Sequence, residues 1–268
     1  MQIQLALVTG ATSGIGFALC HLLAEKGIHL IATGRSLERL QELKNNLNSK
    51  IDLSILAVDL ANKAERAKLI ELIQQKKPNL VINNAGFGLY GEALTYTKEE
   101  QELILEVNGH AVLELTLESA RVMLSNHQPG IILNVSSAAA FQIFPSFAIY
   151  SATKAFVNHF SQSLDYEFRP YGIRVLVACP GMVDTQFQQH AAGAENRVTK
   201  KMNTMSATEV AQLIWQQIQQ QNPLVIMNWK YRLLTALTKL IPQRWLASLL
   251  SRTIQARINP RKIIKTKK

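Results

Sequence analysis

The sequence predicts a doubly wound α/β domain, in which helices cover both faces of a seven-stranded parallel sheet. Seven short runs rich in Val, Ile and Leu recur along the chain, and amphipathic helical stretches separate most of them. Apolar runs of this kind are typical of parallel strands that are buried on both faces. The alternation of strand and helix implies right-handed crossovers between the strands.

The elements are expected in a regular order along the 268 residues. Helices are expected in FALCHLLAEKG after the first strand, in LANKAERAKLIELI after the third, and around IYSATKAFVNHF. Two more helix starts carry capping boxes, Thr97 with Glu100 and Ser206 with Glu209. The strands are expected at residues 5–9, 29–33, 54–58, 80–84, 131–135, 174–178 and 223–227.

Charge divides the chain into two parts. The net charge is +10, but eleven of the 29 Lys and Arg residues follow residue 209, where there is no Asp or Glu. The remainder is nearly neutral, which argues against a nucleic-acid partner for the protein as a whole. We therefore expect a domain at residues 1–228 and a basic helical extension at residues 229–268.

The extension predicts two amphipathic helices, and Pro242 can begin the second. Basic helices of this kind can lie on an anionic membrane surface or bind an acidic partner. They can equally pack on the domain or cover its site, and the sequence leaves these alternatives open. The two apolar stripes are Leu233, Leu234, Leu237, Leu240 and Ile241, and then Leu246, Leu249, Leu250, Ile254 and Ile258.

Cysteine usage and the N-terminal segment favour a cytoplasmic protein. Cys20 and Cys179 lie far apart in apolar surroundings, and neither has the spacing of a metal site or a disulfide framework. The chain begins with a strand pattern rather than a secretory signal. It has no run of about 18 uncharged apolar residues, the length that a membrane-spanning helix needs.

A glycine-rich segment follows the first expected strand and opens the next helix. Gly10, Gly14 and Gly16 form the pattern G-x-x-x-G-x-G. Glycines permit a tight bend and let backbone N–H groups approach a pyrophosphate, which the helix N-terminus then favours. The segment therefore predicts a dinucleotide site, although a glycine-rich loop that binds nothing has the same pattern.

The end of the second expected strand indicates which dinucleotide is bound. A site specific for NAD usually has an acidic residue there to hold the ribose hydroxyls. Here Gly34 is followed by Arg35, and a guanidinium can pair with a 2′-phosphate. We expect NADPH, with NAD possible; the alternative is that Arg35 is only a solvated loop residue. Asp59 can bind the adenine amino group or can simply cap the following helix.

Tyr150 and Lys154 stand four residues apart on an expected helix, which places the phenol and the ammonium on one face. With this pair, six segments occur in the order TGATSGIG, NNAG, VNGH, NVSS, YSATK and PGMVDT. Together they make residues 3–228 resemble the short-chain dehydrogenase/reductase family, which has a Rossmann fold. The helix around Tyr150 resembles that of long-chain 3-oxoacyl-CoA reductases and hydroxysteroid dehydrogenases.

The resemblance implies a role for each matching residue. Tyr150 would be the general acid, with its pKa lowered by Lys154 and by the nicotinamide charge. Ser137, which lies 13 residues before Tyr150, would bind the carbonyl oxygen in preference to Ser136. Lys154 would also hold the nicotinamide ribose, and Asn108 would hold a water molecule in a proton relay. The cofactor residues expected are Gly10, Thr12, Ser13, Gly14, Ile15, Gly16, Arg35, Asp59, Leu60, Asn83, Ala85, Gly86, Tyr150, Lys154, Pro180, Gly181, Val183 and Thr185.

The resulting prediction is an NADPH-dependent carbonyl reductase that acts on a lipophilic ketone or 3-oxoacyl substrate. The resemblance also implies a substrate lid at residues 182–206 and a homodimer or homotetramer. One alternative is an NAD-linked alcohol dehydrogenase. Another is a cofactor-binding protein without turnover, tethered to a membrane by its basic extension. No metal is expected, because the His spacings fit no ligand motif.

Overall fold

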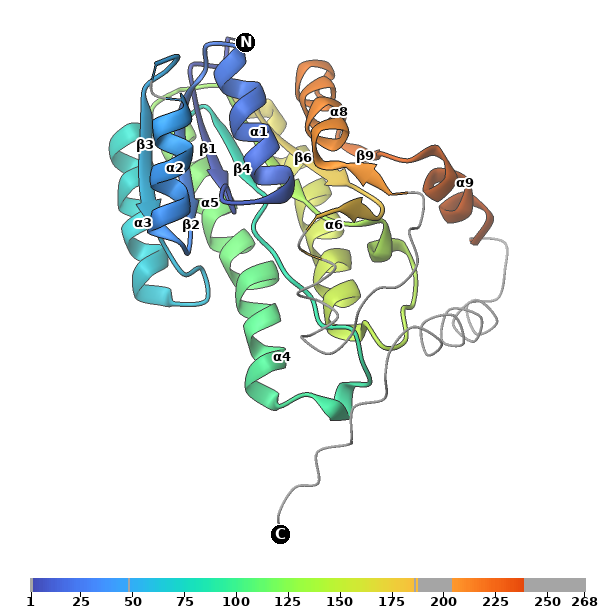
Figure 1. The fold of residues 1–268 in the computed structure, drawn as a ribbon. Helices are drawn as coiled ribbons and strands as arrows, with labels where there is room; N and C mark the ends of the chain where they lie inside the picture. Colours follow the sequence, from blue (N-terminus) through green and yellow to red (C-terminus); the bar gives the residue numbers. More distant parts are fainter. Residues whose placement is uncertain (1, 48, 186, 188–203, 239–268) are drawn as a thin grey trace.

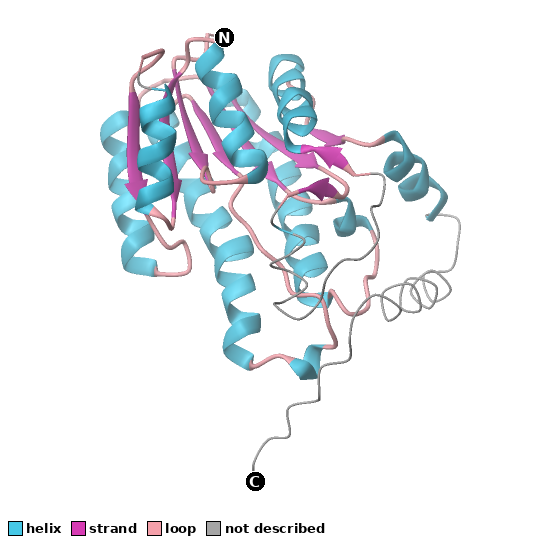
Figure 2. Ribbon diagram, viewed as in Figure 1, coloured by secondary structure: helices cyan, strands magenta, loops and turns pink. Residues whose placement is uncertain are grey.

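The protein is built on a seven-stranded parallel sheet, with helices packed on both of its faces (Figures 1 and 2). The computed structural model describes residues 2–47, 49–185, 187 and 204–238. All seven expected strands are present, in the spatial order β3-β2-β1-β4-β5-β6-β9. They are β1 (Leu5–Thr9), β2 (His29–Gly34), β3 (Leu53–Ala57), β4 (Leu80–Asn83), β5 (Gly130–Val135), β6 (Ile173–Cys179) and β9 (Leu224–Ile226).

The helices form one layer on each side of this sheet. Side chains of α1, α2 and α8 join one buried cluster, and those of α3, α5 and α6 join the other. Along β1, Ala6 and Val8 face the first cluster while Leu7 faces the second, so consecutive positions of the strand are apolar. The helices are α1 (Gly14–Glu25), α2 (Leu37–Leu47), α3 (Lys63–Lys76), α4 (Lys98–Leu105), α5 (Ala111–Ser125), α6 (Ala148–Phe168), α8 (Ala207–Gln220) and α9 (Trp229–Thr238).

The direction of winding changes between β1 and β4. From β1 the chain proceeds to β2 and β3 on one side, and from β4 it proceeds to β5 and β6 on the other. In sheets of this kind, ligands bind in the crevice outside the carboxyl ends of the strands at such a switch point. The topology therefore places the candidate site at the ends of β1 and β4.

Local signals set the helix ends. Both expected capping boxes are present, at Thr97 and at Ser206. Asp59 is not the cap of α3, as one reading of the sequence suggested, because Asn62 accepts the N–H groups of the first turn instead. Between α4 and α5 the chain forms a single π-helical turn, η2 (Glu106–His110). Asn108, which lies in this turn, was a predicted site residue, but the turn itself was not predicted.

The first part of the basic extension packs on the domain. Helix α9 contacts β9 and a short 3-10 helix, η3 (Ala138–Phe141). Leu233, which was assigned to the apolar stripe, is 52% exposed on α9, whereas Thr235 is buried. The second expected helix, from Pro242, lies outside the described residues. No helix in the described part of the chain is long and apolar enough to cross a membrane.

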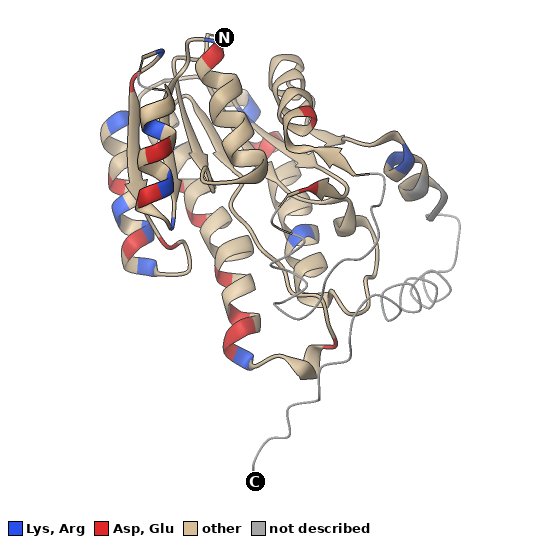
Figure 3. Ribbon diagram, viewed as in Figure 1, with Lys and Arg blue, Asp and Glu red and all other residues tan. Residues whose placement is uncertain are grey.

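Three further features complete the description of the fold. A small parallel pair, β7 (Val183–Asp184) and β8 (Met205–Ser206), joins the two ends of the expected lid; residues 186 and 188–203 lie outside the described part. Acidic and basic residues are interspersed over α2 and α3 rather than separated by sign (Figure 3). Cys20 and Cys179 are free and buried, as their apolar surroundings predicted.

Candidate active site

The glycine segment forms a tight cradle between β1 and α1. Gly10 has a φ of +68°, which favours glycine, and a Cβ on Gly16 would lie 2.2 Å from the carbonyl oxygen of Gly10. Ser13 precedes the first turn of α1, and its side chain makes no capping hydrogen bond. Backbone close enough to reject a methyl group, beside a helix N-terminus, fits the pyrophosphate of a dinucleotide.

The segment after β4 is fastened to this cradle. The Asn84 side chain donates hydrogen bonds to the carbonyls of Thr9 (2.9 Å) and Gly10 (3.3 Å). The backbone N–H groups of Asn84 and Ala85 both donate to Thr9 Oγ1 at 3.0 Å. Asn83, and not Asn84, was named among the expected cofactor residues, but Asn84 makes the contacts with the glycine segment.

Asn83 instead belongs to the interior of the sheet. Its side chain is buried and donates to Asn134 Oδ1 (2.8 Å) and to Thr116 Oγ1 (3.2 Å). Side chains on a strand alternate between its two faces, so neighbouring residues of NNAG point in different directions. The NNAG motif indicated that an asparagine contacts the glycine turn, but it did not indicate which of the two asparagines does so.

The end of β2 has no room for an acidic side chain. A Cβ on Gly34 would lie 2.8 Å from Thr12 Cγ2. Arg35 follows on the exposed edge, and Asp59 lies after β3 with its carboxylate accepting the N–H of Ala61 at 3.0 Å. The three expected cofactor segments, which follow β1, β2 and β3, thus lie at one edge of the sheet. Position 34, at the end of β2, carries no carboxylate.

A cleft of about 810 Å³ lies against the outer side of the glycine turn, between α1, α2 and α8. It includes Thr12, Ser13 and Gly14, and it reaches Arg39 on α2. Tyr150 does not line this cleft. Arg39 was missed by the sequence analysis, although it lies one helical turn beyond Arg35.

Tyr150 and Lys154 extend from the first turns of α6. Lys154 is only 3% exposed, and its Nζ donates to the carbonyl of Val135 at 2.9 Å. Its own carbonyl accepts the hydroxyl of Ser136 at 2.9 Å. The Ser136 hydroxyl is thus hydrogen-bonded to the backbone of α6, whereas the Ser137 hydroxyl lies beside the Tyr150 phenol. The geometry supports the choice of Ser137 over Ser136.

Burial governs the acidity of this pair. It lowers the pKa of Lys154 from 10.5 to about 8. It raises the pKa of the Tyr150 phenol above its ordinary value, and the hydrogen bond from Ser137 offsets this only in part. Lys154 Nζ lies 5.7 Å from the centre of the Tyr150 ring and is directed to Val135. The lowering of the pKa of Tyr150 by Lys154 and the nicotinamide charge stays a prediction, and desolvation of the phenol opposes it.

Asn108 joins this group from the π-helical turn. Its Nδ2 donates to the carbonyl of Phe87 (2.8 Å), and its Oδ1 accepts the N–H of the same residue (3.1 Å). A Cβ on Gly86 would lie 2.9 Å from Asn108 Oδ1 and 3.3 Å from Lys154 Nζ. Gly86 therefore marks the place where the asparagine and the lysine meet.

The segment after β6 approaches from the other side. The Pro180 carbonyl accepts the N–H of Ala138 at 2.8 Å, and Thr185 Cγ2 would lie 3.1 Å from a Cβ on Gly14. Tyr231 of α9 lies against Gly181, where a Cβ would meet its ring at 2.2 Å. The sequence analysis missed this contact, because nothing in a tail residue indicates which surface it covers.

Three other expected cofactor residues are apolar parts of the same frame. Leu60 and Val183 are buried, and Ile15 packs against the cluster beneath α1. Among the described residues, no group of three or more His, Cys, Asp and Glu is arranged to hold a metal ion. The described side chains around Tyr150 contribute hydroxyl, ammonium and amide groups to the site.

Aromatic rings cover the catalytic tyrosine. Phe147 stacks on Tyr150 with ring centres 4.2 Å apart, and Tyr90 stacks on Phe147 at 4.0 Å. Phe187 of the expected lid lies 5.5 Å from Tyr150. These rings exclude water from the phenol, which accounts for its raised pKa, and they make the substrate side of the site apolar.

A glycine cradle at the switch point, with a tyrosine, serine and lysine beside it, is the arrangement of a dinucleotide-dependent oxidoreductase. Comparison with known proteins agrees. Residues 4–196 match the family model described as short chain dehydrogenase. The chain belongs to the short-chain dehydrogenase family and is an NAD(P)-dependent oxidoreductase.

Individual relatives span most of the molecule. An uncharacterized oxidoreductase of Staphylococcus aureus (strain MW2) is 37% identical over 184 residues, which are 68% of this chain and 79% of that protein. A short-chain dehydrogenase from Sphingobium yanoikuyae, solved in complex with NADPH, has a TM-score of 0.80 and 25% identity, covering 99% of this chain and 100% of its own. A bulky-bulky ketone specific alcohol dehydrogenase from Comamonas testosteroni shares the fold, with a TM-score of 0.76 and 23% identity over 97% of this chain and 96% of that one.

Proposed function

We propose that the protein is an NADPH-dependent reductase that converts a lipophilic ketone or 3-oxoacyl substrate to the alcohol. The observation that carries the proposal is the meeting of Ser137, Tyr150 and Lys154 with Asn108 in a buried, apolar site at the switch point. These four side chains come from three separate parts of the chain, and they supply the groups that carbonyl reduction needs.

In this proposal, Ser137 and Tyr150 both donate hydrogen bonds to the carbonyl oxygen of the substrate. When bound, NADPH supplies the hydride that is added to the carbonyl carbon. Tyr150 gives its proton to the oxygen, and the product is a neutral alcohol. Burial raises the pKa of the phenol, so the phenol is protonated at neutral pH, as donation of its proton to the substrate requires. Asn108 and Lys154 would return a proton to Tyr150 from solvent.

The preference for NADPH is supported by the end of β2. Thr12 fills the space where a side chain at position 34 would begin, so a carboxylate cannot be accommodated there without rearrangement. Arg35 is exposed at the same edge, and its guanidinium is a group that can pair with a 2′-phosphate. The NADPH complex of the Sphingobium yanoikuyae relative is consistent with this choice.

The substrate class is supported by the rings around Tyr150. Phe147 and Phe187 present apolar surface beside the phenol, and Ile143 lies exposed nearby in sequence. Apolar surface of this kind favours a substrate that loses water on binding, such as a long acyl chain or a ring system. The two classes named above, 3-oxoacyl thioesters and hydroxysteroid-type ketones, both meet this requirement.

The experiment that tests the proposal is ketone-dependent oxidation of NADPH by the purified protein, with 3-oxoacyl thioesters and bulky ketones as substrates. Tyr150→Phe removes only the hydroxyl, so the ring stack with Phe147 remains. We expect this variant to lose turnover by about 100-fold or more and to bind NADPH as the wild type does. Wild-type turnover in Tyr150→Phe would remove the tyrosine from the proposed role.

We further propose that the basic extension brings the enzyme to an anionic membrane surface that holds its lipophilic substrate. The support is its charge, because it is rich in Lys and Arg and has no acidic residue. Its first helix, α9, already packs on the domain, so residues 239–268 are the segment to test for membrane contact. Assembly into a dimer or tetramer stays a prediction from the family.

A further inference from the structure

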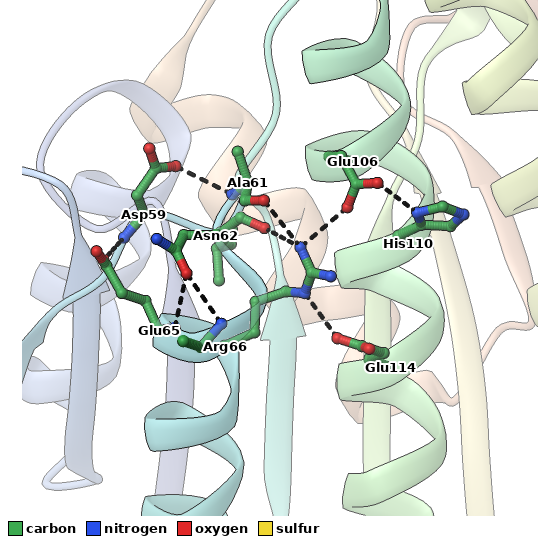
Figure 4. A network of polar contacts seen from close by, with 10 residues as sticks. Asp59, Ala61, Asn62, Glu65, Arg66, Glu106, His110 and Glu114 are labelled. Carbon is green, nitrogen blue, oxygen red and sulfur yellow. Dashed lines mark hydrogen bonds and ion pairs between the residues drawn. The ribbon is translucent and has the colours of Figure 1, made fainter.

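Arg66 is a buried arginine that no part of the proposed chemistry uses. It lies in the first turn of α3 and is 3% exposed. Its Nη1 donates to the carbonyl of Leu60 at 2.7 Å and to that of Ala61 at 3.3 Å (Figure 4). Both carbonyls belong to the loop after β3, which the sequence analysis assigned to the adenine side of the cofactor site.

The other contacts of Arg66 reach across to the helix that contains the π-helical turn. Nε donates to Glu114 Oε2 at 2.6 Å, and Nη1 donates to Glu106 Oε2 at 3.1 Å. The second oxygen of Glu106 lies 2.8 Å from His110 Nδ1. Figure 4 shows the guanidinium between the loop and the two carboxylates. A buried guanidinium with this many partners fixes their relative positions.

The spacing of the two carboxylates depends on the π-helical turn. Glu106 and Glu114 are eight residues apart, and in a regular α-helix, at 100° per residue, they would point about 80° apart around the axis. A π-helical turn inserts one extra residue. That insertion reduces the difference to about 20°, because seven regular steps come close to two full turns. Both carboxylates therefore face Arg66 only when the extra residue is accommodated between them.

The same turn determines where Asn108 lies. Asn108 is two residues beyond Glu106 and is fully buried, with both polar atoms of its amide on the backbone of Phe87. A regular helix would rotate Asn108 away from Phe87, or would separate Glu106 from Glu114. We propose that Arg66 is a positioning residue: it stabilises the π-helical turn through Glu106 and Glu114, and thereby holds Asn108 beside Gly86 and Lys154.

This inference rests on the proposed function only where it concerns turnover. The hydrogen bond from the Phe87 N–H to Asn108 Oδ1 reports the position of Asn108 without any substrate. Its strength can be followed by amide hydrogen exchange resolved at Phe87. The variants are Arg66→Met, Arg66→Lys, Glu114→Gln and Asn108→Ala. The matched control is Arg121→Met, which breaks the exposed ion pair between Arg121 and Glu118. Both residues lie on α5, as Glu114 does, but neither contacts Arg66.

We expect the Phe87 amide to exchange about 5- to 10-fold faster in Arg66→Met and Glu114→Gln, the effect of losing one hydrogen bond. Arg66→Lys should behave in the same way, because an ammonium cannot join two carboxylates and two carbonyls with the geometry of a guanidinium. Asn108→Ala should show the same rate, and adding Arg66→Met to it should change the Phe87 rate no further. Arg121→Met should exchange as the wild type does.

Turnover provides the second measurement. Arg66→Met and Asn108→Ala should each lower kcat about 10-fold or more, since small displacements of catalytic groups are costly, and the double variant should fall no further than Asn108→Ala alone. Unchanged Phe87 protection in both Glu114→Gln and a folded Arg66 variant would overturn the inference. If Asn108→Ala keeps full turnover while Phe87 protection falls as expected, the proposed proton relay is wrong and the positioning role stands.

Discussion

Replacing Arg35 with alanine is expected to weaken the binding of NADPH and to leave the binding of NADH unchanged. The exposed guanidinium stands at the end of β2, where Gly34 lies against Thr12 and no carboxylate is present. A hydrogen bond to a charged group contributes about 1.5 to 3 kcal/mol when shielded from water. Exposed ion pairs contribute about 0.2 to 1 kcal/mol. A bidentate contact with a 2′-phosphate on this open edge should lie between, at about 1 to 2 kcal/mol.

That range corresponds to a rise of about 5- to 30-fold in the Kd for NADPH. The assay is fluorescence titration of wild type and Arg35→Ala with each nucleotide, at low and at moderate salt, because the exposed contact should weaken as salt increases. Lys68→Ala, which removes an exposed cation of α3 outside the cleft, is the matched control. The reasoning is refuted if Arg35→Ala weakens both nucleotides equally, or if wild type binds NADH as tightly as NADPH.

Three further predictions follow from burial and packing. The pKa of Lys154 is lowered to about 8, so its ammonium is lost as pH rises through that value; the Kd for NADPH should rise there, and Lys154→Met should remove the step from the pH profile. Tyr231→Ala should weaken NADPH binding about 5-fold by loosening the segment at Gly181, whereas exposed Leu233→Ala should not. Deletion of residues 239–268 should abolish co-sedimentation with anionic liposomes; equal recovery of both proteins in the supernatant would contradict membrane contact.

The positions of the strands along the chain were readable from the sequence for a local reason. A strand buried on both faces is apolar at most positions, as Leu7 and Val8 are, so each run could be recognised without knowledge of its neighbours. The glycine turn was readable for a similar reason, because the close approach of Gly16 to Gly10 excludes any side chain. Residues whose role is fixed by the backbone beside them could be assigned from short motifs.

Other properties depended on residues far apart in the chain. The burial that raises the pKa of Tyr150 involves rings from distant segments, among them Tyr90, which stacks on Phe147. The partners of Arg66 come from a loop and two helical turns that meet only in the folded protein. Sequence alone determined which groups are present and on which elements they lie. Only the tertiary structure decided how far each group is removed from water and which partner it meets, because desolvation and contact are properties of the packed interior.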